Sequence, residues 1–186
     1  MSIKKLNPTA EFQGINNVHV VDFWAWAYSD VLSNRNRAIL AEYLVSLSLQ
    51  VADNPRVEWD ATDVSLSGKK IEVKSSAYVQ SWAQEKESKI IFDISKKKAW
   101  DAETNKVSDV PIRAADCYVF CLYTNRDKEN TAVLDVENWQ FYVLSTRDLT
   151  NSFGEQKSLS LSRLKKVSDA VAYDNLSQQI RKTLDI

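Results

Sequence analysis

The 186-residue sequence has little of three residue types that carry much enzyme chemistry: one histidine, two cysteines and three glycines. One His and two Cys cannot supply the four ligands of a zinc finger or zinc ribbon. Gly14, Gly68 and Gly154 lie too far apart to form a GxGxxG fingerprint or a Walker A loop. His19 lies in an apolar run, which indicates packing more than catalysis. If the protein is an enzyme, we expect its working groups to be carboxylates and lysines.

The composition is that of one folded domain. Hydrophobic residues make up 44% of the chain and six residues are tryptophan, which is ample material for a core. No linker rich in Pro, Gly or Ser divides the sequence, and no internal repeat is visible. We therefore expect a single domain over residues 1–186.

Cysteine usage and hydropathy predict a cytoplasmic protein. Cys117 and Cys121 lie in an apolar stretch typical of a strand, where they would be roughly 13 Å apart and beyond disulfide reach. Buried thiols fit a reducing compartment. The N-terminus leads to no apolar signal region, and the longest apolar run, Cys117–Tyr123, is too short to cross a bilayer. We expect no membrane partner.

Hydrophobic periodicity predicts a mixed α/β domain with a central sheet flanked by helices. A helix is predicted over 34–49, with Ser33 or Asn34 as its cap. The aromatic segment 22–32 before it is left open between a helix and an extended arm. Strands are predicted at 57–59, 63–66, 71–74, 90–94, 117–123 and 139–144, a loop or short helix at 78–89, and helices at 162–171 and 175–184.

The tripeptide Glu72-Val73-Lys74 is the candidate for chemistry. On a strand, residues two apart project from the same face, so the acid and the lysine would stand side by side. The pattern Glu-x-Lys occurs three times, but the other two copies, at 87–89 and 155–157, have polar middle residues. Only Val73 points into a core and would hold its neighbours rigidly over the opposite face. We interpret the other two copies as surface charge.

The hairpin around Gly68 brings a second acid to this face. A two-residue loop at Ser67-Gly68 or Gly68-Lys69 pairs residues whose numbers sum to 135 or 137. The first register puts Asp63 opposite Glu72, and the second puts it opposite Lys74. In both registers Asp63, Glu72 and Lys74 form one cluster. Asp60 has the other parity and would need a bulge to join them.

Two carboxylates that face each other across neighbouring strands repel unless a positive charge lies between them. Oxygen ligands without His or Cys favour Mg²⁺, with Mn²⁺ as a substitute, over zinc. Lys74 beside such a metal could position the attacking water or stabilise the pentacovalent phosphate as it forms. The alternative is an exposed ladder of cross-strand ion pairs, each worth roughly 0.2–1 kcal/mol.

A helix with an acid, an Asp on one strand and Glu-x-Lys on the next together resemble the PD-(D/E)XK nuclease superfamily, which has the restriction-endonuclease-like fold. Residues 57–76, VEWDATDVSLSGKKIEVKSS, carry the resemblance most strongly. It implies an α-β-β-β-α-β core over residues 29–144, with C-terminal helices of residues 158–186 packed on it. The proline that names the motif is absent before Asp60 and Asp63, so the choice of Asp63 rests on the hairpin register.

The resemblance also implies roles for individual residues. In this superfamily the Asp and Glu of the motif bind the metal, the carbonyl of the residue before the Lys often joins them, and the Lys activates water. These roles fall on four residues: Asp63, Glu72, Val73 through its carbonyl, and Lys74. Many members place a further Glu of the first core helix near the metal, which Glu42 matches. Some branches carry a Gln a few residues after the Lys, where Gln80 lies.

The sequence therefore predicts a Mg²⁺-dependent nuclease, an endonuclease that hydrolyses phosphodiester bonds in DNA. The net charge is only −1, yet lysines concentrate between residues 69 and 98. Candidate phosphate contacts are the basic residues near the motif: Arg35, Arg37, Lys69, Lys70, Lys86, Lys89, Lys96, Lys97 and Lys98. A solvated lysine-rich surface without a partner is the alternative. A homodimer would suit cleavage of both strands, although nothing in the sequence shows one.

Two other functions fit the same sequence. A protein of this fold that binds nucleic acid without cutting it would shift DNA in a gel and leave it intact. An interaction protein would dock a partner through exposed tryptophans, without metal binding and without salt-dependent affinity for DNA.

Overall fold

Four strands form the central sheet of the computed structural model, which describes residues 3–57, 62–98, 100–101 and 106–186. They lie in the order β1-β2-β6-β7, with β1 Val64–Leu66, β2 Lys69–Ala77, β6 Cys117–Tyr123 and β7 Trp139–Ser145. β2 and β6 are parallel and the two outer pairs are antiparallel, so the sheet is mixed. Every residue of β6 is buried, because layers cover both faces of the sheet.

The hairpin between β1 and β2 has the first of the two predicted registers. Val64 pairs with Ile71 and Leu66 pairs with Lys69, which leaves Ser67 and Gly68 as a two-residue loop. Both loop residues have positive φ, 50° and 77°, as a type I′ turn requires. The expectation that the apolar residues of both strands share one face is confirmed, since Val64, Leu66, Ile71 and Val73 are all buried in one core.

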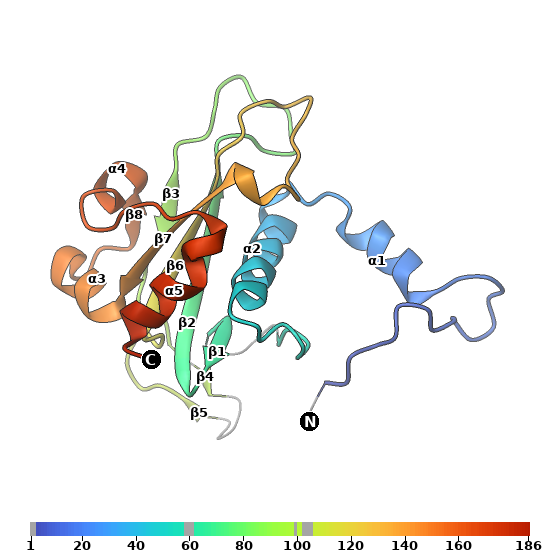
Figure 1. The fold of residues 1–186 in the computed structure, drawn as a ribbon, viewed down its shortest axis with the longest axis horizontal. Coiled ribbons are helices and arrows are strands. Elements are labelled where there is room, and N and C mark those ends of the chain that lie inside the picture. Colours follow the sequence, from blue (N-terminus) through green and yellow to red (C-terminus); the bar gives the residue numbers. More distant parts are fainter. Residues whose placement is uncertain (1–2, 58–61, 99, 102–105) are drawn as a thin grey trace.

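Helices α2 (Asn34–Ser48) and α5 (Tyr173–Leu184) cover that face of the sheet (Figure 1). The predicted helix over 34–49 is thus confirmed, and Ser33 caps it by accepting a hydrogen bond from the N–H of Asn36 at 3.4 Å. The core on this side joins residues of both helices to the sheet: Ala41, Leu44, Val45, Ile71, Val73, Val119, Leu176 and Ile180.

A second core covers the opposite face. It contains β3 (Ile91–Asp93) paired with β8 (Ser158–Ser160), and helices α3 (Thr146–Phe153) and α4 (Leu161–Leu164). Phe92 of β3 meets Phe120 of β6 with ring centroids 5.1 Å apart. The molecule therefore has three layers, and the expected mixed α/β sheet between helices is confirmed (Figure 1).

The crossover between the parallel strands β2 and β6 differs from the expected core. Residues 78–116 make this connection, and their described part holds β3 and the small hairpin of β4 (Trp100–Asp101) and β5 (Lys106–Val107). Where the α-β-β-β-α-β order requires a helix before the last core strand, these described crossover residues contain none. The restriction-endonuclease-like topology stays a prediction.

One predicted helix needs correction, one helix was not predicted, and one predicted strand lies partly outside the described residues. The helix expected at 162–171 is only α4, because the chain turns after Leu164 and Val171 pairs with Phe141 as a β-bridge. α3 was not predicted; Ser145 starts it by capping the N–H of Asp148. The α5 prediction is confirmed. Of the strand expected at 57–59, Val57 is not in a strand and the rest lies outside the described residues, as does Asp60.

The segment before α2 forms α1 (Val20–Tyr28), so the part of residues 22–32 up to Tyr28 is helical and the rest is not. This helix buries none of its residues and projects away from the three layers (Figure 1). Trp26 is 85% exposed. Cys117 and Cys121 are buried free thiols, as expected. Among the described helices, none combines the length and apolar character that a membrane span needs. The remaining element is a short 3-10 helix, η1 (Val136–Asn138).

Candidate functional site

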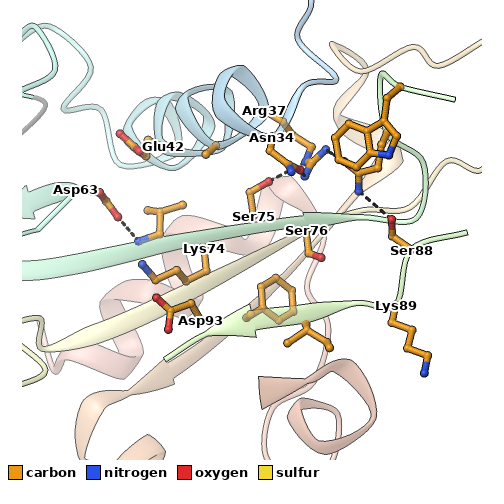
Figure 2. A pocket seen from close by; sticks show the side chains of 16 residues that line it. Asn34, Arg37, Glu42, Asp63, Lys74, Ser75, Ser76, Ser88, Lys89 and Asp93 are labelled. Carbon is orange, nitrogen blue, oxygen red and sulfur yellow. Dashed lines mark hydrogen bonds between the residues drawn. The ribbon is translucent and has the colours of Figure 1, made fainter. Parts of the chain in front are cut away.

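A cleft of about 570 Å³ opens along β2, beyond the point where the short strand β1 ends. Helix α2 lies on one side of it and β3 on the other. Figure 2 shows Glu42 and Asp63 approaching β2 from the side of α2, with Lys74 and Asp93 on the side of β3. Of the predicted catalytic and metal-binding residues, Glu42, Asp63, Val73 and Lys74 line the cleft.

Asp63 is held at the exposed edge of β2 by two hydrogen bonds. Its N–H donates to the carbonyl of Ile71 at 3.2 Å, which continues the ladder one residue past β1. Its Oδ2 accepts from the N–H of Val73 at 2.7 Å. Because the N–H and C=O groups of one strand residue point to the same side, the Val73 carbonyl also faces this edge. The Asp63 carboxylate and the Val73 carbonyl therefore lie at the same edge of β2, and their role at a metal stays a prediction.

The Asp63 carboxyl lies in an unfavourable place for a negative charge. Burial, followed by the nearby charges of Glu72 and Glu42, raises the pKa of Asp63 from 3.8 to about 7. The hydrogen bond from Val73 and the charge of Lys74 lower it by less. The charge of Asp63 is therefore disfavoured by two neighbouring carboxylates, and the charge of Lys74 offsets this only in part. A cation would relieve this repulsion.

Glu72 and Lys74 form an ion pair with each other along β2. Both side chains are more than four-fifths buried, with relative exposures of 17% and 18%. Lys74 lines the cleft, whereas Glu72 is not among the described lining residues and lies behind it. The predicted cluster of Asp63, Glu72 and Lys74 is thus divided, with a pair on one face of β2 and Asp63 at the edge.

Glu42 reaches the cleft from α2, and it is paired with Arg56. The Nη2 of Arg56 donates to Oε1 of Glu42 at 3.1 Å, and Nε donates to the other oxygen. This bidentate contact leaves the Glu42 side chain only 12% exposed. The sequence analysis did not single out Arg56, because it lies in an irregular segment that no periodic pattern links to the helix.

Asp93 is an acidic residue of the cleft that sequence reasoning missed. It lies on β3, and although burial opposes this, hydrogen bonds from Ser95 and the charge of Lys97 lower its pKa below the ordinary value. The Ser95 hydroxyl donates to Oδ1 at 2.6 Å, and Lys97 Nζ lies 3.3 Å from Oδ2. The strand predicted at 90–94 is confirmed as β3, but nothing in the sequence indicated that it would lie beside β2 and bring Asp93 to the cleft.

Arg37 has a different place from the surface phosphate contact that the sequence suggested. It is 3% exposed, and burial lowers the pKa of its guanidinium to about 10. Each of its nitrogens donates to the protein: Nε to Ser75 Oγ at 3.2 Å, Nη1 to Leu32 O at 2.8 Å and to Gln80 Oε1 at 3.1 Å, and Nη2 to Asn34 Oδ1 at 2.6 Å. Arg37 therefore joins α2 to β2 and to the following loop.

Gln80, predicted from the resemblance, does line the cleft, but it is buried and serves this same network. Its side-chain amide donates to Ala77 O at 3.1 Å and to Ser88 Oγ at 3.2 Å. Its acceptor oxygen is taken by Arg37. The geometry gives Gln80 a positioning role for the loop after β2.

The predicted basic residues do not gather into one surface. Lys69 and Lys70 lie at the hairpin end of β2, Lys96 pairs with Glu155, and Lys97 pairs with Asp93. Lys98, Lys86 and Arg35 are exposed. Among the described lysines, only Lys74 and Lys89 line the cleft. The expected cationic face is thus reduced to a few positions near the site.

The residues of the cleft suit partial coordination of a hard divalent cation. They do not form a complete set of protein ligands. Among the described residues, no three acidic, His or Cys side chains converge closely enough to hold a metal ion. Two of the expected ligands, Glu42 and Glu72, are instead paired with Arg56 and Lys74. Mg²⁺, however, commonly takes one or two carboxylates and keeps water and substrate phosphate in its shell. Asp63 and the Val73 carbonyl offer that kind of partial, oxygen-only donor set.

Comparison with protein-family models, with curated proteins and with solved structures finds no match for this chain. The resemblance to PD-(D/E)XK nucleases therefore remains an interpretation of its residues.

Proposed function

We propose that the protein is a metal-dependent nuclease that hydrolyses phosphodiester bonds in DNA. The observation that carries the proposal is the position of Asp63. Its carboxylate is pinned at the open edge of β2, beside the Val73 carbonyl and within the field of Glu72 and Glu42. A carboxyl in an open cleft whose ionised form is disfavoured by burial and by two neighbouring acids is a costly arrangement for stability alone, and such groups are common where function requires them.

Asp63 and the Val73 carbonyl would hold Mg²⁺ or Mn²⁺, with Glu42 as the next available carboxylate. When bound, the metal supplies positive charge to a phosphate oxygen and acidifies a water. Lys74, fixed by Glu72, presents its ammonium to the same cleft, where it orients the attacking water and offsets charge on the phosphoryl oxygens. Water attacks phosphorus, the P–O bond to the leaving strand breaks, and the leaving oxygen takes up a proton.

Cleavage of plasmid and linear DNA in Mg²⁺ and in Mn²⁺ tests the proposal. We expect the wild-type protein to cut DNA. The cleavage rate of Asp63→Asn and of Lys74→Ala should be at least about 100-fold lower, and that of Glu137→Gln should equal the wild-type rate. Glu137 is an exposed acid in η1, so it controls for a change of charge. A Lys74→Ala or Asp63→Asn protein that cuts as fast as the wild type would remove these residues from catalysis.

A second candidate is binding of DNA without cleavage. The ion pairs Glu42–Arg56 and Glu72–Lys74 favour it, because they occupy two of the acids that a two-metal nuclease would use. In that case the protein retards DNA in a gel, with an affinity that falls steeply with salt, and leaves it intact with either metal. The cleavage assay separates this candidate from the first.

A further inference from the structure

The loop after β2 presents an exposed indole at the mouth of the cleft. Trp82 is 52% exposed although it is the largest apolar side chain among the cleft residues. Lys89, at the end of the same loop, also lines the cleft and is exposed. Figure 2 shows Lys89 and Ser88 at the far end of β2 from Asp63. The cleft therefore has an acidic end at Asp63 and an end with an aromatic ring and a cation.

The loop is fixed from within by amide side chains. The Gln84 Oε1 accepts from the N–H of Gln80 at 2.7 Å, and its Nε2 donates to Ser88 Oγ at 3.0 Å. The N–H of Ser88 donates to the carbonyl of Tyr78 at 2.8 Å, which closes the loop. Buried Gln80 and Arg37 then join this network to α2. The backbone on both sides of Trp82 is thus held in place while its ring stays in solvent.

A second set of contacts braces the loop from outside. Arg126 lies over the ring of Tyr78, 4.0 Å from its centroid, and pairs with Glu87 at 2.9 Å. Lys128 donates to the carbonyl of Gln84 at 3.2 Å. None of these contacts uses the indole of Trp82. An ordered loop that exposes a large aromatic ring beside a polar cleft is suited to a ligand with a flat apolar face.

We infer that Trp82 is a stacking platform for an unpaired base, so that the substrate of this cleft is single-stranded DNA. A base in a duplex is covered on both faces by its neighbours, whereas an unpaired base can lie flat on an indole. The inference rests on the proposed function, which supplies the phosphodiester at the acidic end. Lys89, which lines the same cleft, is the candidate contact for a backbone phosphate of that strand.

The length of the cleft places the stacked base away from the scissile bond. Val73 and Ala77 lie four positions apart on β2, which corresponds to roughly 13 Å along the strand. Asp63 marks one end of this stretch, and the loop with Trp82 begins at the other. A strand lying along the β2 edge would reach both. Trp82 then orders the strand without touching the reacting phosphate.

Fluorescence anisotropy tests the inference by measuring binding to a labelled single-stranded oligonucleotide and to a blunt duplex of the same sequence. The buffer contains EDTA, so no metal supports cleavage. The proteins are wild type, Trp82→Ala, Trp82→Phe and Trp26→Ala. Trp26 is the matched control, an exposed tryptophan on α1 and outside the cleft. We expect Trp82→Ala to bind the single strand about 5- to 150-fold more weakly than the wild type. Trp82→Phe should regain most of this affinity, and Trp26→Ala should have the affinity of the wild type.

Equal affinity of Trp82→Ala and wild type for the single strand overturns the inference, as does an equal loss on the blunt duplex. Cleavage of both DNAs by the same proteins in Mn²⁺ keeps this result separate from the proposed activity. A wild-type protein that cuts nothing but binds the single strand through Trp82 supports the stacking and overturns the nuclease. A protein that cuts, with no dependence of binding on Trp82, overturns only the stacking.

Discussion

At the scale of single residues, Asp63 combines a hydrogen bond that fixes it with neighbours that disfavour its charge. Val73 holds the carboxylate at 2.7 Å, yet burial together with Glu72 and Glu42 raises its pKa to about 7. Such an acid weakens the fold whenever it is ionised. The arrangement therefore makes sense if something that binds the ionised form offsets the cost.

This cost predicts a pH-dependent stability. A folded-state pKa of about 7 against 3.8 means that the native protein binds more protons than the unfolded chain between these values. The contribution of Asp63 to the free energy of unfolding thus falls as pH rises from about 4 to about 7, and stays low above that. Asp63→Asn should be more stable than wild type at pH 8, by roughly 1–3 kcal/mol, and nearly equal to it at pH 4.

Urea unfolding in EDTA at both pH values measures this difference. Glu137→Gln, which changes an exposed carboxylate in η1, should follow the wild type at each pH. If Asp63→Asn gained as much at pH 4 as at pH 8, the charge of Asp63 would not be the cause.

At the scale of elements, the site depends on how α2 and the loop after β2 are held against the sheet. Arg37 makes this connection from a buried position, with donors to Ser75, Gln80, Asn34 and the carbonyl of Leu32. A buried guanidinium is expensive to desolvate, which is why its pKa falls to about 10. Its hydrogen bonds offset that expense only while all partners are present.

Replacing Arg37 by methionine keeps much of the side-chain length but removes every donor. The buried acceptor of Gln80 is then unsatisfied, and we expect the free energy of unfolding to fall by about 2–4 kcal/mol. Arg147→Met, at a side chain of α3 that is 83% exposed, should change it by less than ~0.5 kcal/mol. Chemical denaturation of the two variants provides the comparison. Equal midpoints would show that the network does not join the elements as described.

The elements also show which parts of the site the sequence could predict. Alternation in two short strands and Gly68, whose φ of 77° suits the turn, limited the hairpin to two registers, and the structure has the first of them. Helix α2 followed from its apolar positions and Ser33. In contrast, Asp93 and Trp82 line the cleft from the crossover between β2 and β6, and Arg56 reaches Glu42 from the irregular segment before β1. No local pattern encodes how these segments pack against the sheet.

At the scale of the whole molecule, two cores cover the faces of one sheet, and the edge of β2 beyond β1 is a place where backbone groups stay open. β1 is only three residues long, so it covers the first part of β2 and stops at Asp63. The short edge strand thus creates the cleft, and the layers of α2 and β3 form its walls. The fold explains why the acids gather at this point and not elsewhere on the sheet.

Binding of a divalent cation at this edge should stabilise the whole domain, because a ligand that binds only the folded state adds to the free energy of unfolding. At ten times the dissociation constant, Mn²⁺ should contribute about 1.4 kcal/mol, which raises the melting temperature by roughly 3–6 °C for a domain of this size.

The increase in melting temperature should be larger at pH 8 than at pH 6, because metal binding requires the ionised carboxylate of Asp63. Thermal unfolding with and without Mn²⁺ measures it, with Glu137→Gln keeping the shift and Asp63→Asn losing it. A shift of equal size in Asp63→Asn would place the cation elsewhere on the protein and leave the acids of the cleft without the ligand that their geometry suggests.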